Sequence, residues 1–177
     1  MTSKAKVDPV ARARAIAQQL GLHSIPVPVE RVARQLGAEL RVSPLDDEIS
    51  GMIYIKDGVP IIGVNALHHP NRQRFTIAHE LGHLQLHRPA LTETVHVDKK
   101  FRVLMRNQAS SSGTEIMEIQ ANAFAAELLM PCGIFEQLIA NTTTDIDDEE
   151  PLKALAKRFK VSKQAIEYLM RNLSPTK

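Results

Sequence analysis

Apolar residues recur at helical spacing in four parts of the chain. Residues 9–20 and 29–36 each carry apolar side chains three or four positions apart, and a glycine follows each run, as is typical of a helix end. Residues 71–87 repeat the pattern before Pro89, which is expected to end the helix, and residues 114–130 repeat it once more. The pattern therefore predicts four longer helices.

An alternating pattern marks the expected strands. Residues 38–42 alternate as a short strand, and residues 49–66 form two β-rich runs around Asp57-Gly58. Asp-Gly tolerates the positive φ angles of a tight turn, so a hairpin is expected there. Residues 95–105 contain further strand candidates. The predicted fold class is α+β, with helices packed on a small antiparallel sheet of about three strands.

The composition is that of a folded domain without disulfides. The chain has 177 residues, 44% of them apolar, and its single cysteine, Cys132, excludes a disulfide within the chain. We therefore expect a reducing, cytoplasmic setting. No apolar run approaches the roughly 18 residues of a membrane span, and none has signal-peptide length, so no contact with a membrane is expected.

An acidic run marks the start of a distinct C-terminal part. Residues 145–150 are almost all acidic, and after them seven Lys and Arg residues face a single Glu, which leaves residues 151–177 with a charge of +6. We expect a domain boundary here. Residues 1–144 would form the main domain, and residues 145–177 would form a basic tail.

The tail is predicted to contain two short helices. Within residues 151–173, apolar positions follow helical spacing in two segments that meet at Val161-Ser162, as in a helix-turn-helix. Lys160 stands where glycine most often takes the left-handed conformation of the turn, which costs about 1 kcal/mol or more for lysine. DNA binding through residues 151–173 is one interpretation. We favour the other, a helical pair that covers the main domain, because a single copy with few phosphate contacts binds DNA weakly.

Residues 79–83 have the sequence His-Glu-Leu-Gly-His inside a predicted helix. Positions i and i+4 project from one helical face, so His79 and His83 can share a metal ion. Zn²⁺ accepts two imidazoles and a carboxylate while it keeps one position for water. Glu80 would lie beside that water as the general base. The alternative is a surface helix with two ordinary histidines, but shuffling this composition gives only about 0.02 such motifs.

The third metal ligand is expected from the helix at residues 114–130. Glu115, Glu118 and Asn122 lie along one stripe of that helix. A carboxylate on the inner face of an alanine-rich helix is costly to bury without a cation, and this cost favours Glu118 as a metal ligand. The alternative is that Glu118 is an ordinary carboxylate that faces solvent. Glu115 is the other candidate, and Asn122 is expected to hydrogen-bond to a metal ligand.

The segments RFTIAHELGHLQLH and EIQANAFAAELLMP resemble the ImmA/IrrE family of metallopeptidases. The likeness extends over about residues 25–135. The resemblance implies a zincin-like fold, with the glutamate of the family's ExxAN element, here Glu118, as the third ligand. It also implies a substrate class, because members of the family typically cleave helix-turn-helix transcriptional repressors in bacteria or their phages.

Two function hypotheses follow. The first is a zinc metallopeptidase that cleaves such a repressor, with Zn²⁺ held by His79, His83 and Glu118 and with Glu80 as the base. The second is a non-catalytic regulatory protein that sequesters a repressor or contacts DNA. The first places the protein in a bacterial or phage regulatory switch, as the resemblance implies, whereas in the second the metal is structural or absent.

Other polar residues before the motif are weaker candidates. An oxyanion that develops during peptide hydrolysis needs hydrogen-bond donors aimed into the site. The residues considered for this task are Tyr54, His68, His69, Arg72 and Arg74. The sequence selects none of them, and a solvated or structural role is the commoner one for such residues.

Gly82 lies within the motif although a glycine inside a helix costs about 1 kcal/mol relative to alanine. A close approach of another backbone, or of a substrate strand, would explain its presence. A tolerated defect is the alternative.

Overall fold

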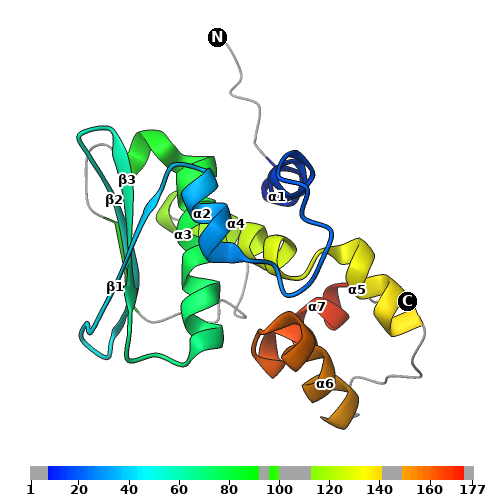
Figure 1. The fold of residues 1–177 in the computed structure, drawn as a ribbon. Helices are drawn as coiled ribbons and strands as arrows, with labels where there is room; N and C mark the ends of the chain where they lie inside the picture. Colours follow the sequence, from blue (N-terminus) through cyan, green and yellow to red (C-terminus); the bar gives the residue numbers. More distant parts are fainter. Residues whose placement is uncertain (1–7, 92–95, 100–112, 141–148, 174–177) are drawn as a thin grey trace.

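The computed structural model in Figure 1 describes residues 8–91, 96–99, 113–140 and 149–173. The helices and strands within these residues are α1 Pro9–Gln19, α2 Val29–Gln35, β1 Glu39–Ser43, β2 Ile49–Lys56, β3 Val59–Asn65, α3 Pro70–Leu91, β4 His96–Lys99, α4 Gly113–Leu129, α5 Cys132–Ala140, α6 Glu149–Phe159 and α7 Lys163–Leu173. The sheet forms one side of the molecule, and α3 lies along it. The helices α6 and α7 lie at the opposite side, next to α5 (Figure 1).

The sheet has the strand order β1-β3-β2-β4. β2 and β3 form the predicted hairpin, and φ angles of 52° at Asp57 and 80° at Gly58 make its turn. β4 pairs antiparallel with β2, whereas β1 runs parallel to β3. The predicted α+β class is confirmed, but the sheet is mixed rather than antiparallel throughout. Alternation within β1 specifies which residues share a face, and it carries no information on the direction of the partner strand.

The long helix α3 carries the His-Glu-Leu-Gly-His motif in its middle. The sequence predicts that Pro89 ends this helix, but α3 instead breaks at His87, where φ is −129°, and continues to Leu91. The break follows from Pro89, which has no N–H to donate to the carbonyl group of Gln85. The motif lies before the break, in regular helix.

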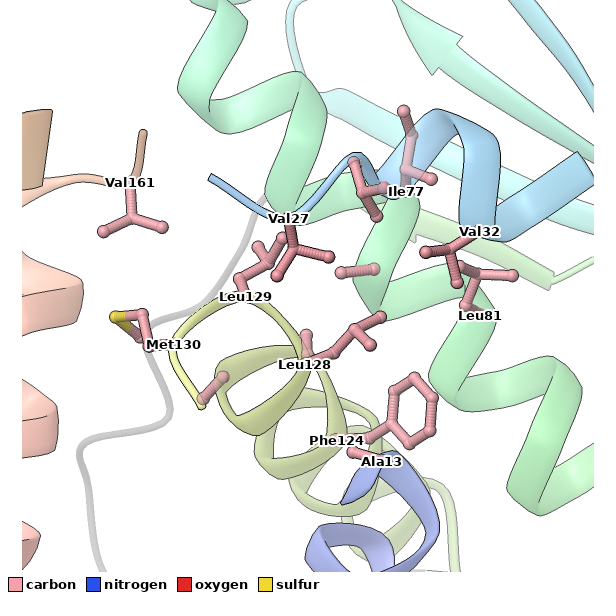
Figure 2. Packing of buried hydrophobic residues seen from close by; sticks show 14 of the residues in the cluster. Ala13, Val27, Val32, Ile77, Leu81, Phe124, Leu128, Leu129, Met130 and Val161 are labelled. Carbon is pink, nitrogen blue, oxygen red and sulfur yellow. The ribbon is translucent and has the colours of Figure 1, made fainter. Parts of the chain in front are cut away.

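The hydrophobic core surrounds the middle of α3. Figure 2 shows Ile77 and Leu81 of α3 gathered with Val32 of α2 and with Phe124 and Leu128 of α4. Each of these side chains is at most 3% exposed. On its other side α3 packs against β2 and β3. The motif is therefore held between the sheet and α4.

The turn between α6 and α7 has the predicted helix-turn-helix geometry. Lys160 adopts a left-handed conformation with φ at 53°. The backbone N–H of Ala165 donates a hydrogen bond of 3.2 Å to Oγ of Ser162, which caps α7 as Ser and Thr commonly do. The two predicted helices of the tail are confirmed.

The apolar sides of α6 and α7 belong to the same core as the rest of the molecule. Phe159 is fully buried, and its ring centroid lies 5.8 Å from that of Phe135 in α5. Val161, in the turn, lies near Met130 at the end of α4 (Figure 2). Burial of these side chains stabilises the contact between the C-terminal helices and the remaining chain.

Two sequence-based predictions fall on residues that the structure does not describe. The domain boundary between residues 144 and 145 and the strand candidate at residues 101–105 lie outside the described residues.

Among the residues that the structure describes, no single helix is long and apolar enough to cross a membrane. The pair α4 and α5, bent by 56°, meets the criteria of length and composition only when the two are taken together.

Candidate metal centre

The two histidines of the motif lie side by side on the buried face of α3. His79 is 1% exposed and His83 is fully buried. Their ring centroids are 4.7 Å apart, and their Nε2 atoms approach to 3.0 Å. The two rings therefore direct the same nitrogen towards one point, as their spacing of about one helical turn predicts.

Glu118 of α4 reaches this point from the other side. Its Oε2 lies 3.2 Å from Nε2 of His79, and its Oε1 lies 3.2 Å from Nε2 of His83. The candidate ligand atoms of the three residues all lie within 4.8 Å of one another. Glu115 is exposed in the first turn of α4, and the group that the described residues form does not include it.

This donor set suits a divalent metal ion. Two imidazole nitrogens that face each other at 3.0 Å need a proton or a cation between them, and a carboxylate that faces both nitrogens favours a cation. Two neutral imidazole nitrogens and one carboxylate oxygen are also the ligands of a common type of catalytic zinc site. The residues present therefore fit a metal ion of this kind.

Asn122 of α4 orients the first histidine. Nδ1 of His79 lies 2.9 Å from Oδ1 of Asn122, and an amide oxygen can only accept, so the imidazole Nδ1–H is the donor. This hydrogen bond leaves Nε2 of His79 unprotonated and directed at the candidate metal position. Such an orienting contact is the one expected from the helical stripe shared by Glu118 and Asn122.

Glu80 lies on the side of α3 that packs against β2. Its side chain is fully buried. β2 approaches α3 closely here because Gly51 has no side chain: a Cβ atom at Gly51 would overlap the methyl group of Thr76 and lie 3.5 Å from Oε1 of Glu80. The sequence reasoning did not single out Gly51. The available signal was a glycine inside a strand, which often marks a close approach.

The oxyanion candidates near the hairpin do not point into this centre. Gly51 faces α3, and successive residues of a strand point to opposite faces, so Tyr54, three positions further on, points away from α3. His68 and His69 precede α3 and lie about 15 Å along the helix axis from His79. The structure therefore does not bring these three candidates together with the motif.

The two arginine candidates tie α3 to neighbouring segments. Nη2 of Arg72 donates a hydrogen bond of 2.8 Å to Oγ of Ser50 in β2. Nη2 of the buried Arg74 donates to the carbonyl oxygen of Val27 at 2.7 Å, and its Nε donates to that of Lys160 at 3.3 Å. Burial lowers the pKa of Arg74 from its ordinary value. These contacts support a structural role for Arg74.

The thiol of Cys132 has the features of an inert group. Its Sγ donates to Oε1 of Glu136 at 3.3 Å. Burial, followed by this hydrogen bond and the charge of the carboxylate, raises the pKa of the thiol. A thiol that is held protonated is a poor nucleophile and a poor metal ligand.

The fold and the centre together define a class of protein. A helix with the HExxH motif, a glutamate from a following helix and an α+β core are the features of a zincin-like metallopeptidase. Residues 33–171 match the family model of the IrrE N-terminal-like domain, peptidase M78. The chain belongs to this family of ImmA/IrrE-type metallopeptidases, as the resemblance of its motifs predicts.

Solved structures share the fold. A Mycobacterium tuberculosis transcriptional regulator matches 95% of this chain with a TM-score of 0.63 and 21% sequence identity. The match covers 48% of that protein, so this chain spans about half its length. At this level of identity the likeness shows the fold alone. No curated protein matches the chain.

Proposed function

We propose that the protein is a zinc-dependent metallopeptidase that cleaves a protein substrate. The observation that carries the proposal is the convergence of His79, His83 and Glu118 on one point, with the buried Glu80 adjacent in the motif. Membership of a metallopeptidase family supports it. In this proposal the first three residues hold Zn²⁺, and Glu80 is the general base.

The chain prepares the ligands for this task. When bound, Zn²⁺ supplies a Lewis acid and lowers the pKa of a water molecule to about 7. Asn122 keeps His79 in the tautomer whose Nε2 carries a free lone pair. Glu118 contributes the negative charge that two neutral imidazoles lack. Burial of both histidines restricts the rings to the orientation in which their Nε2 atoms converge.

Glu80 is proposed to move the proton that peptide hydrolysis requires. A carboxylate beside the attacking water accepts its proton as the carbonyl carbon is attacked, and it donates this proton to the leaving nitrogen as the C–N bond breaks. Full burial shields Glu80 from bulk water, which would otherwise exchange protons with it. A general base of this kind contributes about 10²–10⁴-fold to the rate.

We propose a helix-turn-helix transcriptional repressor as the substrate. This class follows from the resemblance to the ImmA/IrrE family. The fold shared with a transcriptional regulator agrees with a role in gene regulation. The single free cysteine suits the reducing cytoplasm, where we expect the protein to act.

A non-catalytic regulatory protein is the second candidate, and the geometry of α6 and α7 is the observation that favours it. The left-handed Lys160 gives the pair a helix-turn-helix turn, so DNA contact through residues 151–173 is its proposed activity, beside capture of a repressor. One contact weighs against DNA binding. Nζ of Lys163, at the start of the would-be recognition helix, lies 2.9 Å from Oε1 of Glu149, which reduces its availability to a phosphate.

The metal content of the purified protein tests the main proposal. After exhaustive dialysis, we expect about one Zn²⁺ per chain in the wild type and none in His79→Ala and Glu118→Ala. Gln120→Ala, on another face of α4, is the control and should retain the metal. Loss in His79→Ala alone would move the third ligand to Glu115 or elsewhere. A wild type that holds no metal even after zinc is supplied would contradict the proposal.

Incubation with a purified helix-turn-helix repressor then separates the two candidates. Cleavage fragments that a chelator abolishes are expected of a metallopeptidase. Specific retention of DNA without proteolysis would instead support the regulatory binding protein.

A further inference from the structure

Gly82 lies where α3 and α4 cross. A Cβ atom at this position would lie 2.9 Å from Cα and 3.0 Å from the carbonyl oxygen of Ala121. Both are backbone atoms, and they cannot rotate aside as the end of a flexible side chain can. The present separation of the two helices therefore requires a residue without a side chain at Gly82.

Ala121 stands between the two residues of α4 that reach the candidate metal centre. Glu118 precedes it by about one turn and lies 3.2 Å from Nε2 of both His79 and His83. Asn122 follows it directly and lies 2.9 Å from Nδ1 of His79. An outward shift of α4 at Ala121 would carry both side chains away from the histidines.

We propose that Gly82 is a positioning residue that sets metal affinity by fixing the separation of α3 and α4 at Ala121. Gly82 acts through Glu118 and Asn122, since it has no side chain that could bind the metal itself. The inference rests on the proposed metal site. A role in packing alone makes a different prediction, because it lowers the stability of the fold without changing the affinity of the folded protein for metal.

Zinc affinity of the Gly82→Ala variant tests the proposal. The probe is Zn²⁺ itself, in competition with a chromophoric chelator. We expect the Kd to rise about 10–100-fold, the range found when a group that orients metal ligands is lost. Gly133→Ala is the matched control, because a Cβ atom at Gly133 in α5 would meet nothing within 4 Å among the described residues. Its Kd is expected to equal that of the wild type.

A double-mutant cycle shows whether Gly82 acts through Glu118. In the Glu118→Ala background, measured at higher Zn²⁺ concentrations, the ligand that the helix shift displaces is already absent. Gly82→Ala is then expected to weaken binding by a much smaller factor than in the wild type. The same factor in both backgrounds would overturn the proposal.

A series at Ala121 extends the test to the case in which Gly82→Ala does not fold. Ala121→Gly removes a methyl group from the contact, and we expect its Kd to be unchanged or lower. Ala121→Val enlarges the contact, and we expect its Kd to rise. Unchanged zinc affinity in folded Ala121→Val would overturn the proposal, even with a lower melting temperature. A wild type that binds no Zn²⁺ would instead contradict the proposed function on which the inference rests.

Discussion

The crossing of α3 and α4 and the pair of α6 and α7 place their polar and charged groups in opposite ways. At the crossing, the buried His79 and His83 face Glu118 of a helix that is distant in the chain. In the C-terminal pair, Glu149 contacts Lys163 at the surface, and the buried side chains are apolar. The crossing therefore concentrates polar groups away from water, whereas the pair leaves them in solvent.

This difference assigns different tasks to the two regions. Buried polar groups interact strongly with one another, which suits them to metal binding and catalysis. Their burial is costly unless each group is paired, so they contribute little to the stability of the fold. Buried apolar groups stabilise a fold, but they cannot bind a metal ion or transfer a proton. Substitutions at the crossing should thus change metal binding or catalysis, and substitutions under α6 and α7 should change stability.

The largest effect is expected for Glu80→Gln. The amide keeps the shape of the side chain but cannot accept a proton, so the rate of peptide cleavage should fall about 10²–10⁴-fold while the zinc content is unchanged. Cleavage of a repressor substrate and elemental analysis measure the two effects on one preparation. Retained cleavage by a fully metallated variant would remove Glu80 from the mechanism.

Phe159→Ala should produce the largest change in stability. Phe159 is fully buried against Phe135, and truncation of such a side chain costs about 3–5 kcal/mol. Urea denaturation of the metal-free protein measures the loss, and Leu67→Ala, whose leucine is 63% exposed, is the control with an expected change below about 0.5 kcal/mol. If the folded Phe159→Ala variant also lost its zinc affinity, the proposed separation of tasks between the regions would be wrong.

Asn122→Ala should weaken zinc binding without removing a ligand. Loss of the acceptor for Nδ1–H of His79 is expected to raise the Kd about 10–100-fold, or roughly 1.4–2.8 kcal/mol. Asn122→Asp retains an acceptor oxygen and should restore most of the affinity. Gln120→Ala removes an amide from another face of the same helix and should have no effect. Chelator competition compares the three variants, and equal affinities in all of them would exclude an orienting role for Asn122.

Lys160→Gly should stabilise the protein slightly. A left-handed conformation costs lysine about 1–2 kcal/mol, of which the greater freedom of glycine in the unfolded chain offsets about 0.5–1 kcal/mol. The expected gain is about 0.5 kcal/mol. Lys157→Gly, the same change within α6, should have the opposite sign. Thermal denaturation measures both variants, and a loss of stability in Lys160→Gly would mean that its side chain outweighs the backbone effect.

The smallest effect concerns pH and the surface ion pairs. A hydrogen bond from Lys163, followed by one from Lys153, lowers the pKa of Glu149, and the hydrogen bonds that the two lysines donate to glutamates raise the pKa values of both lysines. The stabilisation is therefore lost as pH falls through the lowered pKa of Glu149, below its usual value of about 4.3, or rises through the raised lysine values, above about 10.4. Melting temperatures should show a small deficit of Glu149→Gln near pH 7 that diminishes at pH 3 and in 1 M salt. A deficit that persists in both conditions would contradict this electrostatic origin.

Features that depend on a few neighbouring residues could be predicted from the sequence. The pairing of His79 with His83 on one helical face follows from their spacing, the hairpin turn follows from Asp57-Gly58, and the strained turn follows from the position of Lys160. Each is set by backbone geometry over about one helical turn or less. The same reasoning does not extend to the parallel direction of β1, because that direction depends on which strand of the hairpin β1 pairs with, and it pairs with β3.

By itself, the sequence determined the α+β class, the metal-binding motif and the stripe of α4 from which a third ligand could come. The sequence also favoured Glu118 over Glu115 as that ligand, and the structure places Glu118 against the histidines. Only the tertiary structure decided that Gly82 faces Ala121 and that a second glycine, in β2, lies beside the buried carboxylate of the motif. The physical reason is that helical periodicity restricts a side chain to a face. Which turn of that face meets a partner depends on the distance and crossing point of another helix, and packing between residues far apart in the chain sets both.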